Sequence, residues 1–165
     1  MDILALLTKE FEQEVITTRK MLQRVPDDRF GWKPHVKSMT MLQLTTHIAE
    51  LPGFISMGLN TTELDFAVTP YSPAHVENSA QLLELYEKSV EGGRLSLASA
   101  TESDLLPEWT LRHGDQIFMV LTKYELVRHS LGQTIHHRAQ LGVFLRLLDI
   151  PIPGSYGPSA DEPGF

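Results

Sequence analysis

Four stretches of the chain repeat apolar residues at the spacing of an α-helix, and this pattern limits the fold more than any other feature. They cover approximately residues 2–25, 40–60, 78–100 and 116–148. Such stripes mark helices that bury one face against one another. The only short alternating piece, residues 108–112, is a weak strand signal. We therefore predict an all-α four-helix bundle with long inter-helix connections and a Pro/Gly-rich C-terminal tail, forming a single domain over residues 1–165.

Local signals place the ends of these helices. Thr40 followed by Gln43 has the spacing of a capping box, and Asn78 or Ser79 is the expected N-cap of the third helix. Gly92 and Gly93 would normally end that helix. The apolar pattern nevertheless continues to about residue 100, so both boundaries remain open at this point.

The charge balance excludes several classes of partner. The 165 residues include 14 Lys and Arg against 21 Asp and Glu, a formal net charge of −7. Nucleic acids and anionic membrane surfaces are attracted by clustered basic residues, so neither is expected as a partner. The chain has no cysteine, which excludes disulfides and thiolate-ligated metals. With no targeting segment and no uncharged run long enough to span a bilayer, we expect a cytoplasmic protein.

Histidines carry the strongest chemical signal. His47 follows Leu44 by three residues and precedes Leu51 by four, so it lies on the core-facing stripe of the second helix. On the last predicted helix His129, Gln133 and His137 are spaced four apart and therefore share one side.

Two histidines from separate helices can begin a metal site. Ligands that converge from facing helices typically hold a metal in a bundle, and three protein ligands leave a position open for substrate. His47 and His137 supply two imidazoles, and Gln133 or His129 would supply the third donor. The alternative is a core histidine satisfied by a hydrogen bond, which is the simpler explanation of His47 when it is considered alone.

Several motifs resemble one family over nearly the whole chain. They are Trp32-Lys-Pro-His-x-Lys-Ser38, Leu44-x-x-His47-Ile-Ala-Glu50, Ile135-His-His-Arg-Ala-Gln-Leu141, Phe144-Leu-Arg146 and the tail from Pro153 to Glu162. Together they resemble the DinB-like superfamily of metal-binding four-helix bundles, which includes the bacillithiol S-transferases.

The resemblance implies a divalent metal, nickel or zinc, held by three histidines. One matches His47, and the other two lie four residues apart on the last helix, where this chain has Gln133 and His137. An amide oxygen is a weaker ligand for these metals than an imidazole nitrogen, so Gln133 should lower the affinity. His129, one turn earlier, is the alternative third ligand. Ala139 stands where the family usually has glycine.

By the same resemblance, we expect a metal-dependent enzyme, a thiol S-transferase or a hydrolase, that acts on a small molecule with a low-molecular-weight thiol as a further cofactor. The alternative is a metal-free bundle that serves as a binding or interaction module, in which His47, Gln133 and His137 form a hydrogen-bonded cluster. Two further residues have expected roles: Arg138 in a structural ion pair, and Tyr156 in the wall of a substrate pocket.

A homodimer is also expected. Members of the family often form dimers, and the first and last predicted helices are apolar on more than one face, which requires a second surface to bury them. The residues concerned are Leu4, Ile16, Met21, Ile117, Phe118, Val120, Leu121, Val127, Phe144, Leu145 and Leu147. The alternative is a monomer in which the long connections cover these residues.

Overall fold

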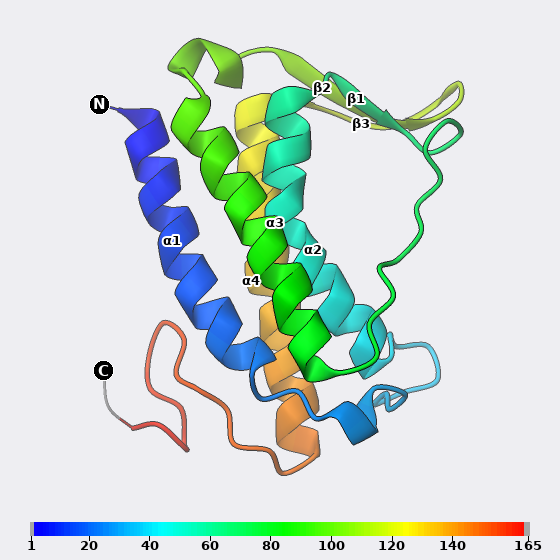
Figure 1. The fold of residues 1–165 in the computed structure, drawn as a ribbon, viewed down its shortest axis with the longest axis vertical. Helices are drawn as coiled ribbons and strands as arrows, with labels where there is room; N and C mark the ends of the chain where they lie inside the picture. The colour runs from blue at the N-terminus through cyan, green and yellow to red at the C-terminus, as the bar shows by residue number, and fades with distance from the viewer. Residues whose placement is uncertain (1, 164–165) are drawn as a thin grey trace.

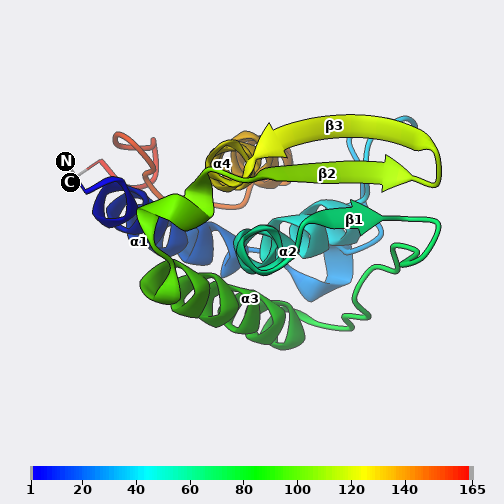
Figure 2. The ribbon, with the colours of Figure 1, turned by 90° about the horizontal axis from the view of Figure 1, so that it is seen from above.

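A computed structural model describes residues 2–163 of the chain. Four long helices lie beside one another, and a small sheet crosses one end of the group (Figure 1; Figure 2). The helices are α1 (Ile3–Leu22), α2 (Met41–Asn60), α3 (Ser79–Ser99) and α4 (Lys123–Leu147). None of the helices in residues 2–163 is both long and apolar enough to span a membrane.

The predicted helix starts of α2 and α3 are confirmed. The Thr40 side chain accepts from the backbone N–H of Gln43, and the Gln43 side chain accepts from that of Thr40. These reciprocal bonds satisfy amide groups that have no partner inside the helix. At the start of α3 the Asn78 side chain accepts from the amide of Gln81.

The prediction of an all-α fold is wrong, because three strands form a mixed sheet. They are β1 (Glu63–Asp65), β2 (Glu108–His113) and β3 (Gln116–Thr122), in the order β1-β2-β3. β2 runs parallel to β1 and antiparallel to β3. Seen along the helices, β2 and β3 cross the end of α4 and project beyond the bundle (Figure 2).

The error lies at the start of the last predicted helix, where residues 116–122 form β3 instead. Gly114 has a φ of 56°, which lets the chain reverse so that His113 pairs with Gln116. The helix begins only after Thr122, whose side chain accepts from the amide of Glu125, while the Glu125 carboxylate accepts from that of Thr122. This capping box fixes the boundary between strand and helix.

Gly92 and Gly93 do not end α3, which continues through both. A Cβ at position 93 would lie 2.8 Å from the Pro52 carbonyl oxygen and 3.1 Å from the ring of Phe11. Because glycine has no side chain, Gly93 allows α3 to approach α2 closely. α2 in turn is continuous through Pro52.

Trp109 of β2 connects the sheet to the helical bundle. This side chain is fully buried, and its indole N–H donates to Thr61 Oγ1 at 2.9 Å, just past the end of α2.

The strand assignment also alters the argument for a dimer, because Ile117, Phe118, Val120 and Leu121 belong to β3 and not to a helix. Elsewhere, Ile16, Val143 and Leu147 are exposed apolar residues of α1 and α4. The homodimer stays a prediction.

Candidate metal site and the tail side of helix α4

His47, Gln133 and His137 come together where α2 lies against α4. The imidazole rings of His47 and His137 are nearly perpendicular, with their centroids 4.7 Å apart. His137 Nε2 lies 2.9 Å from Gln133 Oε1. All three side chains are half-buried, so each keeps some contact with solvent.

Two residues extend this group into the histidine cluster, which we define as His47, Gln133, His136, His137 and Gln140. His137 Nδ1 lies 2.9 Å from Gln140 Oε1, and Gln140 Nε2 lies 3.1 Å from His136 Nε2. Both ring nitrogens of His137 thus have a glutamine partner. Sequence reasoning missed Gln140, although its position three residues after His137 on a helix was a usable signal.

His129 does not join the cluster. It is exposed, one turn before Gln133 on α4, and none of the hydrogen bonds or ring contacts in the described part of the chain connects it to the other histidines. Its role as an alternative ligand stays a prediction.

The surroundings of His47 favour its neutral form. Burial lowers the pKa of His47 below the ordinary value of 6.5, the neighbouring His137 lowers it further, and the carboxylate of Glu50 opposes both. A neutral imidazole offers the lone pair that a metal or a proton donor requires.

Glu50 also fastens the long connection between β1 and α3 beside His47. Its carboxylate accepts from the Tyr71 hydroxyl at 2.8 Å and from the Ala74 amide at 3.2 Å. Burial and this hydrogen bond raise the pKa of Tyr71 to about 12. No sequence signal pointed to Tyr71, because it lies in an irregular segment without periodicity.

The donors of the histidine cluster fit a divalent cation, although weakly. Residues 2–163 contain no group of three or more His, Asp or Glu side chains arranged to hold a metal. The available set is two imidazoles and the amide of Gln133. The 2.9 Å between Gln133 Oε1 and His137 Nε2 is a separation that two ligands can have when each lies about 2.1 Å from one ion. The amide oxygen makes this set weaker than three imidazoles.

A different polar group lies on another face of α4. Arg138 is 2% exposed and forms an ion pair with Glu14 of α1, Nη1 to Oε2 at 2.5 Å. Nη1 also donates to Thr18 at 3.0 Å, and the Tyr156 hydroxyl donates to the other oxygen of Glu14 at 2.5 Å. The structural ion pair expected for Arg138 is confirmed.

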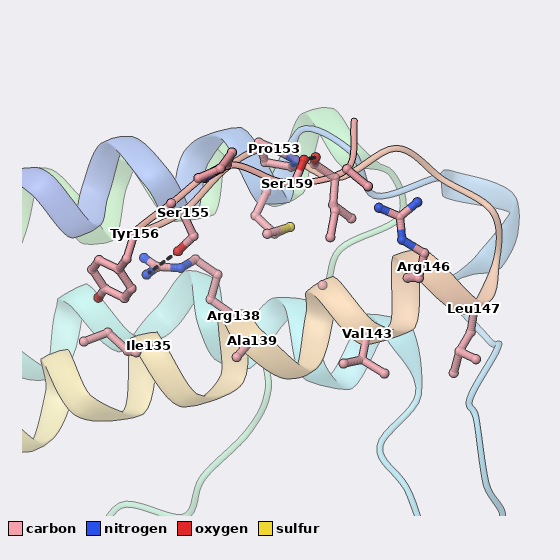
Figure 3. Close-up of a pocket in the computed structure, with 16 residues that line it drawn as sticks. Ile135, Arg138, Ala139, Val143, Arg146, Leu147, Pro153, Ser155, Tyr156 and Ser159 are labelled. Atoms are coloured by element: carbon pink, nitrogen blue, oxygen red, sulfur yellow. Dashed lines mark hydrogen bonds between the residues drawn. The ribbon is translucent and has the colours of Figure 1, made fainter. Parts of the chain in front are cut away.

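Tyr156 lies in the wall of a groove of about 690 Å³, which we call the tail groove, between α4, Met21 of α1 and residues 152–160 of the tail (Figure 3). Ala139, on its floor, is two residues after His137, which turns the two side chains about 200° apart around the helix axis. The tail groove is therefore on the opposite side of α4 from Gln133 and His137. The role of Tyr156 in binding a substrate stays a prediction.

Comparison with known proteins identifies relatives of the whole chain. The model of the DinB family matches residues 1–163. The uncharacterized protein YrdA of Bacillus subtilis (strain 168) is 25% identical over 155 residues, which are 93% of this chain and 88% of YrdA.

Solved structures share the fold. The DinB-like protein YjoA of Bacillus subtilis superposes with a TM-score of 0.68 at 19% identity, over 89% of this chain and 96% of YjoA. A mycothiol-dependent maleylpyruvate isomerase superposes with a TM-score of 0.62 at 15% identity, over 84% of this chain and 60% of the isomerase. Since the family model spans all of the chain but its last two residues, this protein belongs to the DinB family.

Proposed function

We propose that this protein is a divalent-metal-dependent enzyme that uses a low-molecular-weight thiol or water to attack a small molecule. The observation that carries the proposal is the contact between His47 of α2 and His137 of α4, with the Gln133 amide oxygen 2.9 Å from His137 Nε2. Nickel or zinc held by these three residues would supply positive charge that stabilises the anion of a thiol or of water.

The chain's own residues prepare this site in two ways. The lowered pKa of His47 keeps its ring neutral near pH 7, the form in which imidazole binds a metal. Gln140 Oε1 accepts from His137 Nδ1 at 2.9 Å and so orients that ring, as partners of metal-binding histidines usually do.

The choice of a thiol is supported by the structural neighbour that is mycothiol-dependent. Because that neighbour shares only the fold at 15% identity, the thiol, the reaction and the substrate are parts of the proposal.

Metal binding by the untagged protein tests the proposal. We expect zinc or nickel to bind at one site per chain and to be lost in His47→Ala and in His137→Ala, while the exposed loop histidine variant His75→Ala keeps it. Gln133→His should tighten binding by about tenfold or more, since an imidazole replaces an amide. Metal that stays absent after incubation with either ion, in both the native protein and Gln133→His, would contradict the proposal.

A second candidate is a metal-free binding module, and one observation favours it. Both ring nitrogens of His137 lie 2.9 Å from glutamine amide oxygens, so hydrogen bonds within the cluster compete with a metal for this ring. If this candidate is right, Gln133→His binds metal while the native protein does not. The same pair of measurements therefore separates an enzyme with a weakened site from a module that has lost it.

A further inference from the structure

The tail groove is a space that the C-terminal tail covers but does not fill. Its floor is the outer face of α4, where Ala139 is small, and Ile135 and Val143 flank it. Pro153 of the tail lies opposite (Figure 3), and Ile152 also lines the groove. A groove of about 690 Å³ is within the size range of small-molecule sites, roughly 300–1,000 Å³.

The tail over this groove is held by specific bonds. Asp161 forms an ion pair with Arg146 near the end of α4. Glu162 forms another with Arg24 at 3.0 Å and also accepts from the amide of Gly154 at 3.2 Å. These contacts connect residues 154–162 to α4 and to the turn that follows α1, so the position of the tail over the groove is defined by the fold.

A buried guanidinium with unused donors lies at one end of the groove. Arg138 Nη1 is occupied by Glu14 and Thr18. Nη2, in contrast, donates only to Ser155 Oγ at a long 3.4 Å, and the guanidinium lies 5.4 Å from the centre of the Tyr156 ring. Nε makes no hydrogen bond to residues 2–163, and because no buried side-chain nitrogen among these residues lacks a partner, Nε is accessible to solvent. Nε and Nη2 form one edge of the guanidinium, and this edge is the fork that binds both oxygens of a carboxylate.

The remaining lining suits an anion with an apolar body. Two arginines, Arg138 and Arg146, line the groove, and no Asp or Glu of the described residues does. The helix face from Ile135 to Leu147 is about 18 Å long at 1.5 Å per residue. The groove is thus long and mainly apolar, with Arg138 near one end and Arg146, which is already paired with Asp161, near the other. This arrangement fits an extended apolar chain with one charged head at Arg138.

We propose that the tail groove is a second binding site, which takes an unbranched apolar monocarboxylate. Its carboxylate lies on the Nε–Nη2 edge of Arg138, and its chain lies along α4 toward Leu147. The site is on the opposite side of α4 from Gln133 and His137, and this inference is independent of any metal there.

Titration calorimetry of the untagged protein with dodecanoate, below its micelle concentration, tests the ligand class. We expect saturable binding of one molecule per chain. Dodecyltrimethylammonium has the same chain with the opposite charge, and it should bind at least about tenfold more weakly because it cannot accept from Arg138. Absence of saturable dodecanoate binding, or equal binding of the two amphiphiles, overturns the proposal.

Two variants test the location. Ala139→Phe places a ring in the groove at an exposed helix position, and it should weaken dodecanoate binding at least about tenfold. The matched change Ala98→Phe, at an exposed alanine of α3, should leave binding unchanged. Arg138→Lys keeps the charge beside Glu14 but lacks the fork, so dodecanoate binding should weaken. Binding that survives both Ala139→Phe and Arg138→Lys overturns the proposal.

The other possible occupant of the groove is a second copy of the chain. Light scattering distinguishes it: a mass of twice 18.6 kDa that Ala139→Phe reduces to 18.6 kDa would make the groove an interface and overturn the proposal. His137→Ala is the control for the opposite side of α4, and it should leave dodecanoate binding unchanged whether or not a metal site exists.

Discussion

The two sides of α4 hold their polar side chains in different ways. On the side of the histidine cluster, half-buried and exposed rings pair with neutral amides at 2.9–3.1 Å. On the tail side a full ion pair, Arg138 with Glu14, is buried to 2% and 6% exposure.

The histidine cluster can exchange its hydrogen-bond partners for water or a ligand, whereas the buried Arg138–Glu14 ion pair must form for the protein to fold. Amide–imidazole hydrogen bonds near solvent contribute little net free energy, because water can replace either partner. A buried guanidinium has no such replacement, and its carboxylate is required for stability. We therefore expect changes on the tail side to alter the free energy of unfolding, and changes on the histidine side to alter binding.

The largest effect should follow from breaking the buried ion pair. Glu14→Ala leaves the guanidinium of Arg138 buried without its charge partner, and we expect a loss of about 3–5 kcal/mol in the free energy of unfolding. Urea denaturation measures it. His137→Ala should cost less than about 1 kcal/mol. Equal losses of unfolding free energy in Glu14→Ala and His137→Ala would contradict the expected difference between the two sides of α4. In the double variant Glu14→Leu, Arg138→Met most of the loss should return, because both charges are gone.

A smaller effect should distinguish two tyrosine–glutamate bonds, one on each side. Tyr156→Phe removes the donor to buried Glu14, and Tyr71→Phe removes the donor to half-buried Glu50. We expect about 1–2 kcal/mol for Tyr156→Phe and less for Tyr71→Phe, because an acceptor left without its donor costs more when it is buried. Hydrogen exchange and urea denaturation measure both. A larger loss of unfolding free energy for Tyr71→Phe than for Tyr156→Phe would contradict the expectation that the tail side contributes more to stability.

The smallest effect is a pH dependence on the histidine side. The pKa of His47 is lowered in the folded protein, so the unfolded chain takes up this proton first as the pH falls. Its contribution to stability is present above pH 6.5 and is lost as the pH falls from 6.5 toward the folded pKa. Because His47 is half-buried, we expect about 0.5 kcal/mol or less. Urea denaturation at pH 7.5 and 5.5 in chelator should show a smaller pH difference for His47→Asn than for the native protein. If His47→Asn shows the same pH difference in unfolding free energy as the native protein, other titratable groups are responsible for it.

Local signals in the sequence predicted much of the helical frame. Thr40 with Gln43 caps α2 as expected, and Asn78, one of the two expected N-cap residues, caps α3, since capping depends on residues close together along the chain. The same signal was present in Thr122 with Glu125, and it would have separated β3 from α4. The apolar residues of 116–122 fit a helix or a strand by pattern alone, and only pairing with β2 decides between them.

The sequence by itself determined the four helices, the spacing that places Gln133 and His137 on one side of α4, and the choice of residues that can bind a metal. Helix periodicity and capping are local, so short stretches of chain specify them. Only the tertiary structure decided that the rings of His47 and His137 are in contact and that Pro52 and Phe11 pack closely against Gly93. It also decided that Arg138 is buried against Glu14, 124 residues away. These contacts depend on which faces of distant helices meet, and burial then sets the free energy of each charge.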